Sequence, residues 1–230
     1  MKNVKVILWG LGAMGGGIGK MLAKKKGVDI VGGIDIGDKI GKNLYDVVPG
    51  IVQGDRADVI VGTPDEVIVP GAADIVVVCT NSFTKDVFDK LIFVMERGMN
   101  VITSAEEMAY PQAQEPELAK KLDECAKKNG VSVMGTGINP GLIMDLLVIL
   151  WTAACEEVNH ITSRRVNSLS PFGPAVMEEQ GIGMSVEDFN ERKAKGTMAG
   201  HVGFAESVGM MCEALGWKLE DFGQDMEPII

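Results

Sequence analysis

The chain has 230 residues, 46% of them hydrophobic and 23% charged, which is enough to bury a core in one large domain or two modest ones. Its formal net charge of −10 argues against a nucleic acid partner. The four cysteines are widely scattered and there are only two histidines, so we expect neither a metal site nor a disulfide framework. The longest apolar stretch is too short to span a bilayer and the N-terminus lacks the order of a signal peptide, which predicts a cytoplasmic protein with no membrane partner.

The first half of the chain alternates short apolar strands with helices. Strands are predicted at Val4–Trp9, at 28–35, near Val59, at 73–80 and, in the segments NVIT and VSVMG, at 100–103 and 131–135. Helices are predicted from the first glycine cluster to Gly27, at 84–97 before Gly98 and at 116–128 before Gly130. This alternation predicts an α/β fold in which residues 1–137 form a doubly wound parallel sheet.

The pattern changes at the start of a second domain, which we place at 138–230. Asn139 as N-cap and Pro140 at the first helical position predict a long, largely buried helix over 139–154. Further predicted elements are a strand at 160–167, a capped polar helix at 185–194 and an apolar helix at 201–215 closed by Gly216. This mixture predicts an α+β domain. A mixed sheet needs more strands than these, so we expect the domain to be truncated at Ile230.

A glycine-rich turn connects the first strand to the first helix. Gly10, Gly12 and Gly15 fit the pattern G-x-G-x-x-G, and Asp35 ends the next strand. The first glycine allows a tight turn, the second lets the backbone approach a diphosphate, and the third lets the helix pack on the strand, while the helix N-terminus attracts the anion. These features predict a Rossmann domain that binds a nicotinamide dinucleotide through Gly10, Leu11, Gly12, Ala13, Met14, Gly15 and Asp35.

Two further features concern the cofactor. Asp35 should accept hydrogen bonds from ribose hydroxyls and repel a 2′-phosphate, which favours NAD over NADP. Lys39 and Lys42 leave this choice open, because either could accommodate the extra phosphate. Thr80 and Asn81 follow a central strand at its carboxyl end, and they either line the cofactor or cap the helix that follows.

A pair of carboxylates follows the strand at 100–103. Adjacent residues of a helix point about 100° apart, so at most one of Glu106 and Glu107 faces a given cleft and acts as the catalytic acid/base. The alternative is structural, because Ser104 and Glu107 have the spacing of a capping box. The residues alone leave both interpretations open.

Polar residues near the domain junction could complete a site. Asn139 could reach the nicotinamide amide or cap the following helix. Arg165 and Asn167 alternate on one predicted strand and would face the same way, and Arg165 could bind a carboxylate in a fork. His201 either donates a hydrogen bond to substrate or is an ordinary surface or core histidine.

Five segments, taken together and in order, resemble the 2,4-diaminopentanoate dehydrogenase and native amine dehydrogenase family: WGLGAMG, SAEEMAYP, GTGINPG, SRRVNSLSPFGP and GHVGFAES. The first segment is common to Rossmann dehydrogenases, and the two-domain layout also resembles dihydrodipicolinate reductase. The other four segments are more specific. The resemblance spans nearly the whole chain.

The resemblance implies NAD(P)-dependent oxidative deamination of 2,4-diaminopentanoate to 2-amino-4-oxopentanoate and ammonia. The family's acid/base is a glutamate, which maps onto the Glu106/Glu107 pair. Members of the family are homodimers with longer chains, which agrees with the expected truncation. The positions that line the family's substrate pocket correspond to Asn139, Arg165, Asn167, Phe172 and His201.

Two other functions fit parts of the sequence. An imine reductase of the dihydrodipicolinate reductase type would need a histidine-rich catalytic stretch followed by lysine, and the sequence has no such stretch. A protein that binds NAD without turnover would fit the glycine turn. That function gives no role to the acidic pair or to the basic segment around Arg165.

Overall fold

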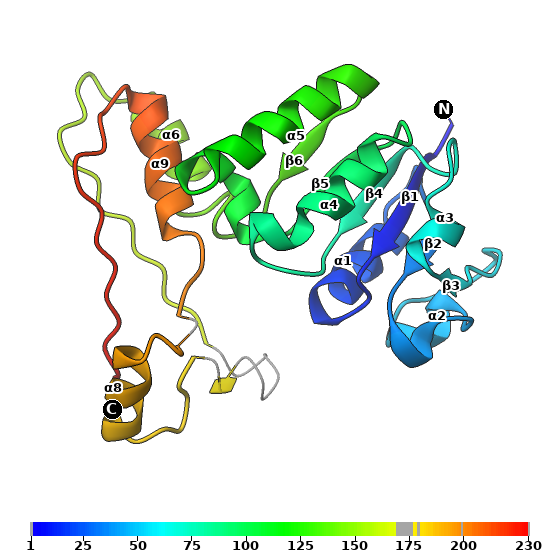
Figure 1. Ribbon diagram of the computed structural model, residues 1–230, viewed down its shortest axis with the longest axis horizontal. Coiled ribbons are helices and arrows are strands. Elements are labelled where there is room, and N and C mark those ends of the chain that lie inside the picture. The colour runs from blue at the N-terminus through cyan, green and yellow to red at the C-terminus, as the bar shows by residue number, and fades with distance from the viewer. Residues whose placement is uncertain (1, 169–176, 179, 199, 230) are drawn as a thin grey trace.

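The computed structural model describes residues 2–168, 177–178, 180–198 and 200–229 (Figure 1). Within these ranges one six-stranded parallel sheet has the strand order β3-β2-β1-β4-β5-β6. The strands are β1 (Val4–Trp9), β2 (Val28–Ile34), β3 (Val61–Gly62), β4 (Ile75–Val78), β5 (Asn100–Thr103) and β6 (Val133–Gly135). The strand order reverses between β1 and β4, so the predicted α/β, doubly wound parallel sheet is confirmed.

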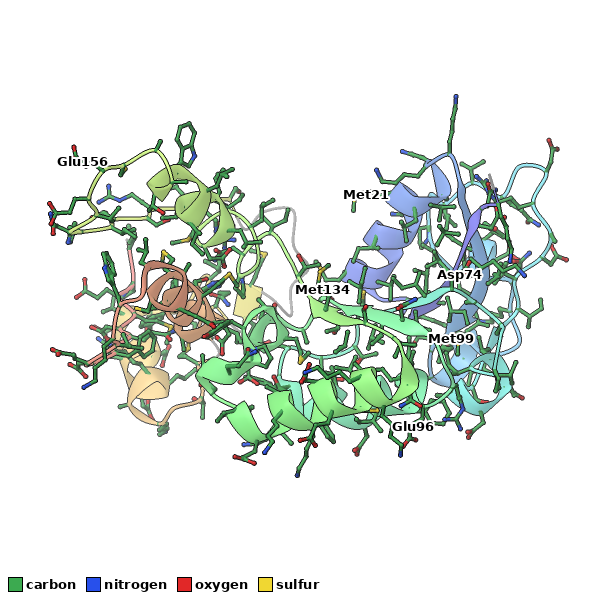
Figure 2. All side chains as sticks on the ribbon, turned by 90° about the horizontal axis from the view of Figure 1, so that it is seen from above. Met21, Asp74, Glu96, Met99, Met134 and Glu156 are labelled. Atoms are coloured by element: carbon green, nitrogen blue, oxygen red, sulfur yellow. The ribbon has the colours of Figure 1, made fainter. Side chains whose placement is uncertain are left out.

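Successive side chains of the strands enter two different cores. From β1, Ile7 and Trp9 pack with α4 (Thr84–Met95) and α5 (Pro116–Asn129), while Val6 and Leu8 pack with α1 (Ala13–Ala23) and α2 (Leu44–Val47). Figure 2 shows α1 on one side of the sheet and α4 and α5 on the other. Coverage of both faces is the reason that these strands are almost continuously apolar.

Coverage is less complete at the β6 edge of the sheet. Val133 packs against the core that contains α4 and α5, so Met134 faces the opposite side of the strand. The Met134 side chain is 50% exposed. Figure 2 shows it on the side of the sheet that carries α1.

The part of the chain from β1 to β6 is called the sheet region below. Besides the elements already named, it contains the short helices α3 (Pro64–Val67), η1 (Gly37–Lys39), η2 (Glu106–Ala109) and η3 (Pro111–Ala113). Helix α5 ends before Gly130, as predicted, and that glycine has a φ of 65° in the left-handed region.

The described part of the chain after β6 is called the second region below. It contains α6 (Leu146–Thr152), α8 (Val186–Ala194) and α9 (Phe204–Leu215). Ser185 caps α8 by accepting a hydrogen bond from the Asp188 N–H at 3.1 Å, which confirms the predicted capped helix. Helix α9 ends at Gly216, as predicted, but begins three residues later than expected. It packs against the turn that follows β5, where Gly209 lies so close to the Tyr110 ring that a Cβ would be 2.9 Å from it.

The predicted long, buried helix over 139–154 is wrong in both extent and burial. Gly141 has a φ of 118°, which is not helical, and α6 begins only at Leu146. Its N-cap is Asp145, not Asn139, and the Asp145 side chain accepts a hydrogen bond from the Leu146 N–H. Trp151 on α6 is 69% exposed.

The predicted strand at 160–167 is also wrong, because this segment pairs with no strand of the described residues. A strand is stable only when its backbone groups have a partner. Val166 is 89% exposed, and Figure 1 draws the segment as coil. None of the helices in the described ranges has the length and apolarity needed to cross a membrane.

Candidate active site

The glycine turn after β1 is built from close backbone contacts. Gly10 has a φ of 95°, and a Cβ on it would lie 2.5 Å from the carbonyl oxygen of Cys79, at the end of β4. A Cβ on Gly15 would lie 1.7 Å from the Gly10 carbonyl oxygen. Side chains at either position would therefore push β1, α1 and β4 apart.

Gly12 is the exception in this turn, because a Cβ on it would meet no atom within 4 Å. Gly12 is the N-cap of α1, where no side chain of the described residues caps the backbone and the first turn carries no acidic residue. Gly12, Ala13 and Met14 are all exposed. The positive end of the helix dipole therefore faces open space, as an anion site requires.

Asp35, at the end of β2, is already engaged on both carboxylate oxygens. Its Oδ2 accepts from the Leu11 N–H at 2.8 Å and from Lys39 Nζ at 2.7 Å, and its Oδ1 accepts from the Ile36 N–H at 2.8 Å. Partial burial alone would raise the pKa of Asp35, but Lys39 and the two N–H groups together lower it below its usual value. Lys42 pairs instead with Asp38, at 3.2 Å in an exposed position.

Thr80 and Asn81 hold a lysine instead of capping α4. Lys90 Nζ, on α4, donates to Thr80 Oγ1 at 2.9 Å and to Asn81 Oδ1 at 2.6 Å. The N-cap of α4 is Phe83, whose side chain makes no capping hydrogen bond. The capping interpretation of Thr80 and Asn81 is therefore wrong.

Glu106 and Glu107 occupy different environments in η2. Glu107 is buried, and its Oε2 accepts from the Thr84 N–H at 2.7 Å, so it serves the first turn of α4. Glu106 is partly exposed, and no described residue hydrogen-bonds to its carboxylate. The predicted capping box of Ser104 and Glu107 is absent, because Ala105 is the N-cap of η2.

Two residues that the sequence did not indicate join this pair to the second region. Gln114 Nε2 donates to Glu206 Oε1, on α9, at 2.7 Å, and lies 3.5 Å from Glu107 Oε1. Glu206 is completely buried, and its Oε2 has no partner among the described residues. Burial raises the pKa of Glu206, and the charge of Glu107 adds to that effect. The signal in the sequence that could have indicated Glu206 is its position as an acidic residue within a largely apolar predicted helix.

Asn139 and His201 meet at the junction of the two regions. Asn139 Nδ2 lies 2.8 Å from His201 Nε2, an arrangement in which the amide donates and the neutral imidazole accepts. Burial lowers the pKa of His201, and the charge of Arg165 lowers it further. Asn139 Oδ1 is buried without a partner among the described residues.

Asp145 fixes the backbone at this junction. Its Oδ2 accepts from the Gly141 N–H at 2.7 Å and from Ser207 Oγ, on α9, at 2.9 Å. Beyond it, Gly203 lies against Pro140, where a Cβ would be 2.4 Å from the proline ring. These contacts hold the loop that carries Asn139 against the start of α9.

Within the described residues, the structure does not bring the remaining predicted substrate residues together in one pocket. Arg165 and Asn167 are exposed, and no strand sets their side chains on one face. Arg165 lies close enough to His201 for its charge to act on the imidazole. Phe172 lies outside the described residues.

A cavity of about 780 Å³ lies in the second region. No predicted site residue lines it, but two of its lining residues contact His201: the Phe204 ring lies 4.4 Å from the imidazole, and Gln224 Nε2 donates to the His201 carbonyl at 3.1 Å. The cavity is bounded by α9 and by the coil segments near His160 and Trp217. Its lining includes Met144, Phe204, Met211, Leu219 and Phe222.

The predicted coenzyme residues and the acidic pair lie along the end of the sheet where the carboxyl ends of the strands meet, which is called the sheet edge below. Gly10 contacts Cys79, the Ser104 N–H donates to the Val78 carbonyl at 3.1 Å, and a Cβ on Gly135 would lie 1.9 Å from the Met108 carbonyl oxygen. The carboxyl ends of β1, β4, β5 and β6 are therefore adjacent, with the loop carrying Asn139 directly after β6. A parallel sheet of this strand order with a G-x-G-x-x-G turn at the switch point defines the Rossmann class of α/β folds.

Comparison with known proteins narrows this class. Residues 142–230 match the family described as 2,4-diaminopentanoate dehydrogenase C-terminal domain. The chain is 63% identical over 231 residues to the 2,4-diaminopentanoate dehydrogenase of Acetoanaerobium sticklandii, an alignment that covers 100% of this chain and 65% of that protein. The structure of the amine dehydrogenase from Mycobacterium smegmatis matches with a TM-score of 0.75 and 26% identity, covering 96% of this chain and 64% of that one.

These matches confirm the resemblance to the 2,4-diaminopentanoate dehydrogenase and amine dehydrogenase family that the motifs indicate. The chain spans 65% of the length of the Acetoanaerobium sticklandii relative. Both the sheet region and the second region take part in the similarity, because the aligned segment covers the entire chain.

Proposed function

We propose that the protein carrying this sequence is an NAD(P)-dependent amine dehydrogenase that converts 2,4-diaminopentanoate to 2-amino-4-oxopentanoate and ammonia. The observation that carries this proposal is the 63% identity, along the whole chain, to a protein named for that activity. Glycine geometry at the sheet edge and a partly exposed carboxylate nearby support it. The resemblance also supports a homodimer in the cytoplasm.

The residues present fit a nicotinamide dinucleotide. The open space at Gly12 and the uncapped start of α1 suit the diphosphate, and Asp35 suits the adenine ribose. The buried, unpartnered Asn139 Oδ1 is an acceptor suited to the carboxamide N–H of the nicotinamide. When bound, the nicotinamide ring would accept the hydride from C4 of the substrate.

We propose that the site accepts both cofactors and prefers NAD. Asp35 favours ribose hydroxyls over a phosphate. Lys39, however, neutralises this carboxylate through a contact of 2.7 Å and is itself only partly exposed, so the repulsion of a 2′-phosphate is reduced.

Glu106 is the proposed acid/base. It would take a proton from the substrate amine and then activate the water that hydrolyses the imine. Its partial exposure and lack of a hydrogen-bonding partner among the described residues leave it available for this task. Glu107 is the weaker candidate, because its buried carboxylate is engaged by the Thr84 N–H.

The carboxylate of the substrate suits the junction residues. Arg165 would bind the carboxylate of the amino acid, and His201 would donate to it from the pair with Asn139. Asn167 and Phe172 are proposed to line the same pocket, on the basis of the family resemblance.

An assay that measures NAD reduction by the natural protein in the presence of 2,4-diaminopentanoate tests the proposal. Glu106→Gln is expected to lower kcat by about 100-fold or more while leaving NADH affinity unchanged, because only the proton transfer is lost. Glu107→Gln is the matched variant, since it keeps an acceptor for the Thr84 N–H and should retain most of the turnover. Wild-type kcat in Glu106→Gln, or no NAD reduction by the wild-type protein, would overturn the proposal.

A further inference from the structure

Lys90 differs from the other lysines near the sheet edge in having no acidic partner. Lys39 pairs with Asp35, and Lys85, on the same helix as Lys90, pairs with Glu115. Among the described residues no carboxylate lies within 4 Å of Lys90 Nζ. Its two hydrogen-bonding partners, Thr80 and Asn81, are neutral. Asp86, one helical turn earlier on α4, acts on Lys90 through its charge but forms no ion pair with it.

The Lys90 ammonium lies beside the glycine turn. Thr80 Cγ2 is 3.1 Å from the point where a Cβ on Gly10 would be, and Lys90 Nζ is 2.9 Å from Thr80 Oγ1. Strand β4, which leads to Thr80, neighbours β1 on the side opposite to β2. Lys90 and the Asp35–Lys39 pair thus flank the turn from its two sides.

The ammonium also has an unused donor. A lysine side chain carries three N–H groups, and Thr80 and Asn81 accept from two of them. No third acceptor is found among the described residues. Partial burial lowers the pKa of Lys90, so the position favours an incoming anion that restores the lost solvation.

We propose that Lys90 is a phosphate-binding residue of the dinucleotide site, donating its third N–H to a phosphate oxygen. This inference rests on the proposed use of NAD(P). It adds a side-chain cation from α4 to a site otherwise formed by backbone N–H groups at the start of α1. Thr80 and Asn81 act as positioning residues that hold the ammonium at the turn.

Titration of NADH and NADPH into wild-type protein and the variant Lys90→Gln tests the inference. Loss of one charge-assisted hydrogen bond is expected to weaken binding by about ten-fold or more. The salt dependence of binding should also decrease, because one cation no longer meets the phosphate. An equal loss for both coenzymes places the contact at the diphosphate, whereas a loss confined to NADPH would contradict the position of Lys90 on the side of the turn opposite to Asp35.

Two further variants separate charge from structure. Lys85→Gln removes a cation from the same helix that is exposed and paired, and it should bind both coenzymes as the wild type does. Lys90→Arg keeps the charge and should retain most of the affinity. Wild-type affinity in Lys90→Gln for both coenzymes would overturn the inference alone. A wild-type protein that binds neither coenzyme would overturn the proposed function, and the inference with it.

Discussion

The tightest contacts of the glycine turn join backbone to backbone, whereas at the junction of the two regions polar side chains also take part in the contacts. At the turn, the positions of Gly10 and Gly15 leave no room for a Cβ beside neighbouring carbonyl oxygens. At the junction, Gln114 bonds to Glu206 and Asn139 bonds to His201. The proposed coenzyme side is therefore set by close backbone packing, and the proposed substrate side by polar side chains, of which Glu206 and His201 can gain or lose a proton.

This difference predicts two kinds of sensitivity. A backbone contact cannot relax around an added methyl group, so the turn should respond sharply to substitution and weakly to pH. A buried polar network should tolerate a substitution of similar shape but respond to pH. Two experiments examine these responses separately.

The largest effect is expected from Gly15→Ala. The new Cβ would lie 1.7 Å from the Gly10 carbonyl oxygen, and the forced separation should lower the free energy of unfolding by about 3 kcal/mol. Urea unfolding measures this change. Loss of NADH affinity should accompany it, because the turn is displaced.

Gly17→Ala is the matched control on the same helix. A Cβ there would meet no atom within 4 Å, and alanine favours the helix over glycine by about 0.5–1 kcal/mol. This variant should therefore be as stable as the wild type or more stable. Equal stability of the Gly15 and Gly17 variants would contradict the described geometry of the turn.

A smaller effect is expected at Glu206. Burial raises the pKa of this carboxyl above the ordinary value of 4.5, so the folded protein holds the proton more tightly than the unfolded chain does. The stability that the protonated form provides is complete below 4.5 and is lost as pH rises through the folded pKa. Glu206→Gln, which cannot ionise, should therefore gain stability relative to wild type as pH rises.

Urea unfolding of both proteins from pH 4.5 to pH 8 checks this sign, starting from the ordinary pKa of the group. The amide oxygen introduced by Glu206→Gln would still accept a hydrogen bond from Gln114, so the comparison isolates the charge. Parallel pH profiles for the two proteins would show that Glu206 titrates as it does in the unfolded chain.

The sheet region could be predicted well because its signals are local. Each strand is apolar where two cores cover it, and α5 ends at a glycine that takes a left-handed conformation. The glycine turn could be predicted for the same reason, since the close approach of neighbouring backbone segments permits only glycine at its tightest positions. In the second region, by contrast, the helix start depends on the φ of Gly141, which the letters NPG do not reveal.

The candidate site could be predicted only in part because its decisive contacts are not local. The choice between Glu106 and Glu107 depends on the Thr84 N–H, which lies 23 residues from Glu107 in sequence. Gln114 and Glu206 are 92 residues apart, and no periodicity connects them. The segment with Arg165 reads as a strand from its alternation, but alternation does not supply a partner for its backbone.

Binding of a nicotinamide dinucleotide is the central claim, and calorimetric titration of NADH and NADPH into the folded natural protein tests it most directly. Saturable binding of NADH, weakened by added salt, is the predicted result. A sample with a cooperative unfolding transition that takes up neither NADH nor NADPH would contradict the account.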